Sequence, residues 1–148
     1  MKTVIIYSSR HHQNTFQLVS ALKRGFGVEL VNADRDPVPD LYKYDCVGFA
    51  SGIEHGKLYD SVQKVIDKSL PKNKRIFFAY TCGSNGKKYR EMLRNTAKEY
   101  NCELLGIYSC KGVDTYGPMK LVGGINKGRP ALSDIIAFIG FYTTNCLK

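Results

Sequence analysis

The sequence predicts an α/β protein in which helices cover both faces of a parallel β-sheet. Short, continuous apolar runs alternate along the chain with segments whose apolar residues recur every three or four positions. A continuous apolar run is typical of a strand that is buried on both faces. The 148 residues contain no long linker and no internal repeat, so we expect a single domain spanning 1–148.

Five strands and four helices are expected. The strands are predicted over 3–8, 28–31, 46–50, 75–80 and 103–110. The first three helices are predicted over 16–26, from 58 to just before Pro71, and over 89–100. The last begins after Pro130, with an apolar stripe formed by Leu132, Ile135, Ile136 and Ile139. The segment 34–44 contains two prolines and is expected to be a loop with at most one turn at 41–44, and 112–128 is a glycine-rich loop.

Composition indicates a globular protein in a reducing compartment. The hydrophobic share is 43% and the charged share 24%, both ordinary for a soluble domain. No signal peptide is evident, and the apolar stretch 131–147 carries polar residues such as Asp134, so we expect a core helix there and no membrane span. The five cysteines form no C-x-x-C pair, which favours free thiols and a cytoplasmic location.

The chain is basic, with 22 Lys+Arg against 13 Asp+Glu and a net charge of +9. Such a charge could serve nucleic acid, an anionic membrane surface or an acidic protein partner. The basic residues are not sharply clustered along the chain. We therefore favour a general surface charge or the steering of a partner, and expect no nucleic acid.

Three turns carry binding chemistry, at 8–15, 51–57 and 81–89. They follow the first, third and fourth predicted strands, and in a parallel sheet such turns meet at the carboxyl edge, where ligands bind. The first turn runs into a helix, whose N-terminal N–H groups and dipole favour an anion. Ser9, Asn14 and Thr15 add neutral donors and Arg10 adds a charge. We interpret this turn as a phosphate cradle.

Other motifs in the sequence give little support for a nucleotide, thiolate or metal site. The glycine-lysine turns at 52–57 and 83–88 do not have the spacing of a nucleoside-triphosphate loop, and no G-x-G-x-x-G occurs. Cys82 begins a strand-to-helix turn, but no arginine follows closely enough to clamp phosphate, so a small turn residue is favoured over a nucleophile.

His11 and His12 lack further ligands for a metal; a solvated role and a contact with the ligand remain equally open. Tyr59 and Tyr89 open helices beside the proposed binding edge, and either could stack on a planar ligand.

The sequence resembles the flavodoxin family over nearly its whole length. The opening Ile6-Tyr7-Ser8-Ser9, followed by Arg10 to Thr15, resembles that family's strand, phosphate loop and helix. The run from Tyr44 to Ile53 is similar to its third strand and second flavin loop. The segments Asp114–Pro118, Gly123-Gly124 and Lys127–Pro130 resemble the tail of short-chain flavodoxins.

The resemblance implies a three-layer flavodoxin-like fold with a five-stranded sheet of order 2-1-3-4-5 and one non-covalent FMN. By the resemblance, the phosphate would be held by Ser9, Asn14 and Thr15 with the amides of Arg10, His11, His12 and Gln13. Ser51, Gly52 and Ile53 would border the isoalloxazine, and Gly56 and Lys57 would face its reactive edge. Thr81, Cys82 and Gly83 would close the other side, beside Tyr89. No metal is expected.

The implied function is that of a monomeric electron carrier that shuttles electrons between redox protein partners. Two alternatives remain open: a flavin-dependent oxidoreductase of the quinone-reductase or protoporphyrinogen-oxidase type, and a flavin-free binding module. The chain departs from the family in its Arg10-His11-His12 loop, its lack of tryptophan and its positive charge. Because reduced FMN tends to be held as an anion, Lys57, Lys87 or Lys88 near it would make the low-potential couple less negative. The basic charge also implies acidic docking faces on the partners.

Overall fold

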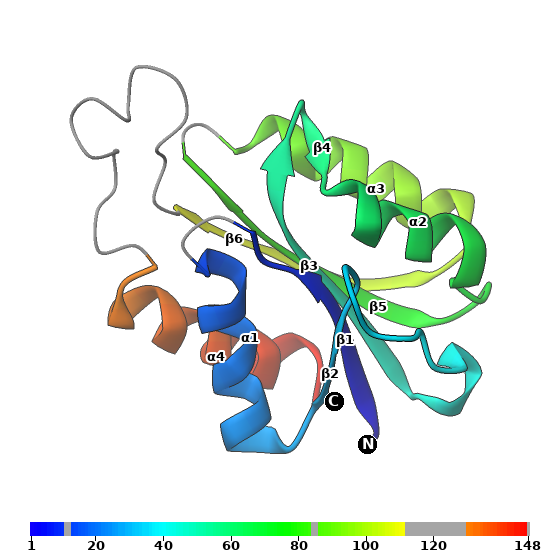
Figure 1. Cartoon of the computed structure of the whole chain (residues 1–148). Coiled ribbons are helices and arrows are strands. Elements are labelled where there is room, and N and C mark those ends of the chain that lie inside the picture. Colours follow the sequence, from blue (N-terminus) through cyan, green and yellow to red (C-terminus); the bar gives the residue numbers. More distant parts are fainter. Residues whose placement is uncertain (11–12, 84–85, 112–129, 148) are drawn as a thin grey trace.

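The computed structural model describes residues 1–10, 13–83, 86–111 and 130–147, which form one central sheet with helices on both faces (Figure 1). The parallel strands are β1 (Thr3–Ser8), β2 (Glu29–Asn32), β3 (Cys46–Glu54), β5 (Arg75–Cys82) and β6 (Glu103–Lys111). Their order is β2-β1-β3-β5-β6. This is the predicted order 2-1-3-4-5 once the parallel strands are counted along the chain. A two-residue strand, β4 (Lys57–Leu58), pairs antiparallel with β3 and was not predicted.

Two helices cover each face of the sheet. In Figure 1, α2 (Asp60–Ser69) and α3 (Lys88–Glu99) lie on one side. The first and last helices, α1 (Asn14–Phe26) and α4 (Leu132–Asn145), lie together on the other. Helix α1 ends at Phe26, as predicted, and the next residue is Gly27, whose φ of 65° is readily adopted by glycine. The α/β fold class and the three-layer arrangement are confirmed.

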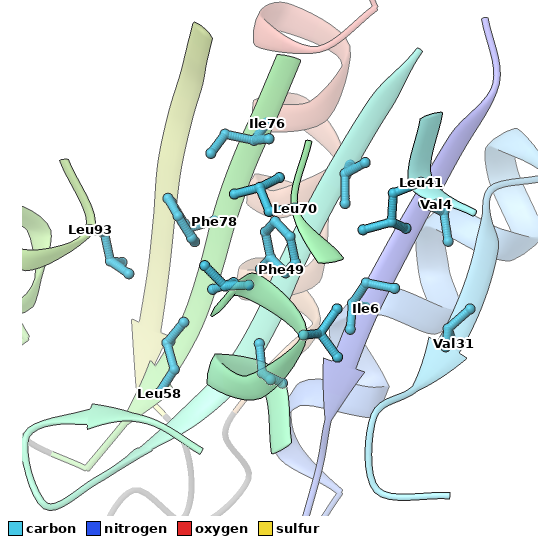
Figure 2. Close-up of a cluster of buried hydrophobic side chains, with 14 of the residues drawn as sticks. Val4, Ile6, Val31, Leu41, Phe49, Leu58, Leu70, Ile76, Phe78 and Leu93 are labelled. Carbon is cyan, nitrogen blue, oxygen red and sulfur yellow. The ribbon is translucent and has the colours of Figure 1, made fainter. Parts of the chain in front are cut away.

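Alternate residues of each strand fill two separate cores. Ile6, Phe49 and Phe78 point toward α2 and α3, in the cluster drawn in Figure 2. Ile5 and Phe77 point to the opposite face and pack against α1 and α4. Each fully buried aromatic or aliphatic side chain of this size stabilises the fold by about 1.5–3 kcal/mol. Burial on both faces explains why the strands are continuous apolar runs in the sequence.

The third strand is longer than predicted and ends in a hairpin. It continues four residues beyond Ala50 to Glu54, and Glu54 pairs with Lys57 across a two-residue turn. The turn residues His55 and Gly56 have φ values of 53° and 78°, as in the tight turns that match the twist of a hairpin. The hairpin includes Leu58, so α2 begins at Asp60 instead of the predicted position 58.

Helix α4 packs through only part of the predicted stripe. Ile135 and Ile139 are half-buried against the core, but Leu132 and Ile136 are 73% and 60% exposed. The helix is apolar on more than one side, so its spacing does not select the buried face; Phe141 and Tyr142 pack edge-on against Phe77. None of the helices in the described ranges is long and apolar enough to cross a membrane.

The segment between β2 and β3 is a loop, as its prolines predicted. It contains one 3-10 turn, η1 (Leu41–Lys43), that begins where the Asp40 carboxylate accepts a hydrogen bond from the Tyr42 N–H. The other long connection, the glycine-rich stretch 112–128 with its flavodoxin-like segments, lies outside the described residues.

Candidate functional site

The predicted site lies at the carboxyl edge of β1, β3 and β5. In the register of the sheet, Ser8 is beside Ser51 and Gly52 is beside Thr81. The hydroxyl oxygens of Thr15 and Thr81 lie 3.4 Å apart in a buried position. The three turns expected to carry the binding chemistry therefore meet in space.

The first turn leads directly into α1. Asn14 and Thr15 are buried in the first helical turn, and the Ser9 hydroxyl accepts a hydrogen bond of 2.9 Å from the Phe16 N–H. Gln13 precedes them in a left-handed conformation with φ 56°. The first turn of α1 contains no acidic residue. A helix N-terminus with hydroxyl neighbours and no carboxylate fits a phosphate group.

The structure describes only some of the other residues predicted to contribute to this turn. His11 and His12 fall outside the described residues. Gln13 is exposed, and within the described ranges its side chain makes no capping hydrogen bond to α1. Ser9 is half-buried at the mouth of the turn, beside the N-terminus of the helix.

Arg10 faces neighbouring elements of the protein. Its Nη2 donates to Asp34 Oδ1 at 2.9 Å, and its Nη1 lies 3.7 Å from Glu54 Oε2. The guanidinium carbon is 4.8 Å from the centre of the Tyr59 ring. Arg10 thus joins the first turn to the segment that follows β2, to the β3–β4 hairpin and to the start of α2.

Asp34 is the carboxylate at the centre of this arrangement. The Ser8 hydroxyl donates to its Oδ2 at 2.5 Å, while Arg10 donates to its Oδ1. Partial burial acts to raise the pKa of Asp34, but hydrogen bonds from Ser8, Arg10 and Ser61 outweigh burial and hold the pKa below its ordinary value. Asp34 is therefore ionised at neutral pH and fixes Arg10 in place.

The second predicted segment, 51–57, is strand and hairpin. Ser51 is fully buried; its hydroxyl donates to the Gly52 carbonyl and accepts from the Tyr59 N–H. Gly52 lies against Tyr59, because a Cβ at Gly52 would be 2.5 Å from the Tyr59 hydroxyl oxygen. Ile53 is half-buried, whereas Gly56 and Lys57 are exposed in the hairpin. Along this wall Ser51 and Gly52 are buried, and only Ile53 and the hairpin residues that follow it are accessible to solvent.

The third predicted segment begins at the end of β5. The Tyr80 hydroxyl donates to the Gly86 carbonyl and closes the turn, and Tyr89 packs edge-on against Tyr80 with ring centres 5.9 Å apart. Burial is the main effect on Cys82 and raises the pKa of its thiol, despite the opposing charge of Lys111. A raised pKa argues against a thiolate nucleophile. Cys82 was predicted to be a small turn residue, but it is the last residue of β5 and pairs with Lys111 of β6. Thr81 is buried beside Gly52, and Gly83 is half-buried in the turn.

The two candidate aromatic platforms differ. Tyr59 is only 6% exposed and one face of its ring is covered by Arg10. Tyr89 is half-buried, with the Lys88 ammonium 5.2 Å from its ring centre. Tyr89 is thus the more accessible of the two, although it also packs against the core between α3 and the sheet.

Two residues of this edge were missed from the sequence. Asp34 carries the only obvious signal: it is the first charged residue after the second strand, so its position at the carboxyl edge could have been predicted. Arg90 could not be identified from the sequence, because its position depends on contacts with β6, where it donates to the Ile107 carbonyl and to the Ser109 hydroxyl. Among the described residues, no group of histidine, cysteine or carboxylate side chains is arranged to hold a metal ion.

The sequence matches no known family model. It is 37% identical over 137 residues to the uncharacterized protein MJ0298 of Methanocaldococcus jannaschii, and the match covers 91% of each chain.

Solved structures with a similar fold include a flavodoxin and a protein solved with FMN. An archaeal flavodoxin superposes with a TM-score of 0.63 at 15% identity and covers 95% of this chain and 93% of its own. General stress protein 14 of Treponema denticola, solved with FMN, gives 0.68 at 11% identity, covering 97% and 99%. Rubredoxin oxygen:oxidoreductase of Desulfovibrio gigas gives 0.70 at 16% identity over 97% of this chain and 35% of its own.

Fold and edge together define a flavodoxin-like α/β protein, which confirms the resemblance inferred from the sequence. Within that class, the chain belongs to the same family as protein MJ0298.

Proposed function

We propose that this protein binds FMN at the carboxyl edge of its sheet and carries electrons between redox proteins. The observation that carries the proposal is the convergence of the α1 N-terminus with the ends of β3 and β5. Thr15 of the first turn reaches Thr81 of the third, and Thr81 is the sheet neighbour of Gly52. A phosphate cradle and two walls for a planar ring thus share one edge, as ligand sites do in open α/β sheets.

The residues at this edge fit the two ends of FMN. The phosphate is assigned to the amides at the start of α1 with Ser9, Asn14 and Thr15, and the ring to Gly52, Ile53 and Thr81 through Gly83. Lys57 and Tyr89 flank the ring on either side. When bound, the flavin supplies the capacity to accept and release electrons, while the protein orients it, limits water and sets the local charge.

Positive charge around the proposed ring position should affect the reduction potential of the bound FMN. Lys57 is exposed in the hairpin, Lys88 stands over Tyr89, and Lys111 is close enough to act on the Cys82 thiol. Cations stabilise the negative charge that FMN carries when fully reduced. We therefore expect a less negative low-potential couple than an acidic flavodoxin shows.

Spectroelectrochemical titration of the FMN-loaded protein measures that couple. Lys57→Gln should make it more negative, whereas Lys72→Gln, in the connection before β5 and thus at the opposite edge of the sheet, should leave it unchanged. A strongly negative couple that is insensitive to Lys57→Gln would refute the electrostatic proposal.

The partners are proposed to be redox proteins that present acidic faces, since the chain has a net charge of +9. The experiment reduces the FMN-loaded protein without oxygen and mixes it with an acidic and a basic redox protein of similar potential. Electron transfer to the acidic protein should be the faster and should slow as salt is raised. Equal, salt-independent rates would contradict acidic docking, and rapid multiple turnover of a small substrate such as a quinone would favour an enzyme.

A further inference from the structure

Arg10 occupies the turn that the proposed function assigns to phosphate, yet its guanidinium is engaged by two carboxylates of other segments. It donates to Asp34 at 2.9 Å and to the Ser61 hydroxyl at 3.4 Å, and it lies 3.7 Å from Glu54. Asp34 follows β2, whereas Glu54 and Ser61 lie at the end of β3 and the start of α2. Arg10 is therefore a cross-link between the turn after β1, the end of β2 and the hairpin with the start of α2.

The contact with Asp34 makes it unfavourable for the Arg10 side chain to move to a bound phosphate. Asp34 is partly buried, and among the described residues its carboxylate accepts hydrogen bonds from the Ser8 hydroxyl and from Arg10, while a hydrogen bond from Ser61 also lowers its pKa. Moving Arg10 to a phosphate would leave a half-buried carboxylate without its cation beside a bound anion. Both changes are unfavourable, since a desolvated charge needs its partner and like charges repel.

The cross-link extends to the wall of the proposed flavin site through Tyr59. The Arg10 guanidinium covers the Tyr59 ring at 4.8 Å from its centre, a favourable cation–π geometry. The Tyr59 hydroxyl lies against Gly52, and the Tyr59 N–H donates to the Ser51 hydroxyl at 2.9 Å. The ring is thus held between Arg10 on one side and the strand that forms the wall on the other.

We propose that Arg10 is a positioning residue that clamps the phosphate turn to the 51–53 wall through Asp34 and Tyr59, and that its side chain is not a phosphate ligand. The proposal rests on the proposed FMN site and says how that site keeps its shape. It replaces the expected electrostatic role of the Arg10 side chain and leaves the Arg10 amide available to the cradle.

The two roles predict opposite effects at Asp34. Apoprotein is titrated with FMN and with riboflavin, which lacks the phosphate, and quenching of flavin fluorescence is followed. If Arg10 is a clamp, Arg10→Gln weakens riboflavin as well as FMN, the latter about fivefold or more, because the 51–53 wall faces the ring that both ligands share. Asp34→Asn then weakens both as well, and the double variant is little worse than the poorer single variant.

If Arg10 instead binds the phosphate, the pattern reverses. Arg10→Gln would weaken FMN selectively, and Asp34→Asn would strengthen FMN binding by freeing the guanidinium and removing a nearby negative charge. That result overturns the proposal. Arg24→Gln is the matched control, since Arg24 lies in the last turn of α1, where its side chain donates an exposed hydrogen bond to the Ser20 hydroxyl.

A second measurement tests the clamp without flavin. The NMR signals of the Tyr59 ring, identified by their loss in Tyr59→Phe, should shift in Arg10→Gln and in Asp34→Asn but not in Arg24→Gln. If the wild type binds neither flavin, the proposed function is refuted. The Tyr59 signals still test in that case whether Arg10 acts as a clamp. Tyr59 signals that are unchanged in both variants would overturn it.

Discussion

Thr15 and Thr81 are separated by 66 positions in the sequence, yet their hydroxyl oxygens lie 3.4 Å apart in a buried position. This contact joins the start of α1 to the end of β5. It brings together two of the three turns at the carboxyl edge of the sheet, and the third is attached because Thr81 pairs with Gly52.

The threonine pair should behave as a coupled unit. Thr15→Val and Thr81→Val each remove one hydroxyl at nearly constant volume and should lower the free energy of unfolding by about 1 kcal/mol. The double variant should lose clearly less than the sum, because neither hydroxyl is then left buried without its partner. Urea unfolding of the four proteins measures this, and strictly additive losses would show that the contact has no energetic role.

Gly52→Ala should weaken FMN binding. The new Cβ would fall 2.5 Å from the Tyr59 hydroxyl oxygen, so the Tyr59 ring must move and loosen its contact with Arg10. Gly140→Ala is the control, since nothing lies within 4 Å of its Cβ in α4 and alanine favours a helix by about 0.5–1 kcal/mol. The titration with FMN compares the two, and equal affinity in both would mean that the 51–53 wall does not contact the flavin.

The contribution of Asp34 to stability should disappear in acid. Its pKa is lower in the folded protein than its ordinary value of about 3.9, so the stabilisation is present above that value and is lost as the pH falls through the folded pKa. The difference in unfolding free energy between wild type and Asp34→Asn should therefore be larger at pH 6 than at pH 3. A difference that stays constant or grows toward pH 3 would contradict the ionised Asp34–Arg10 pair.

Thiol accessibility should divide the five cysteines. Cys46 and Cys146 have no exposed surface, and a hydrogen bond with Cys146, together with burial, raises the pKa of the Cys46 thiol. Cys82, Cys102 and Cys110 are half-buried. A disulfide reagent at mildly alkaline pH should titrate at most three thiols in the folded protein and five in denaturant. Rapid reaction of all five in the folded protein would contradict the burial of Cys46 and Cys146 in the core.

Much of the fold follows from local patterns in the sequence. The strand Thr3–Ser8 was predicted with its observed bounds, because a strand buried on both faces is a continuous apolar run and β1 is central. The extension of β3 to Glu54 was missed, since Ser51 and Gly52 resemble a loop and become strand only through pairing with β1 and β5.

The direction of the strands was enough to predict which turns form the site. The contacts between side chains within the site could not be predicted. Turns after parallel strands must share an edge, so Thr15, Gly52 and Thr81 could be placed together. The direction of Arg10 could not, because it depends on Asp34 and Tyr59, which are close to it only in the folded protein. The exposed Leu132 and Ile136 were misplaced for a related reason: an apolar helix offers several faces, and the aromatic core around Phe77 selects one.

The most direct test of the account is a titration of the wild-type apoprotein with FMN and with riboflavin, followed by quenching of flavin fluorescence. We predict tight binding of FMN and much weaker binding of riboflavin, because the phosphate is held at the start of α1. Binding of neither flavin, or equal binding of both, would contradict a phosphate cradle in the turn after β1.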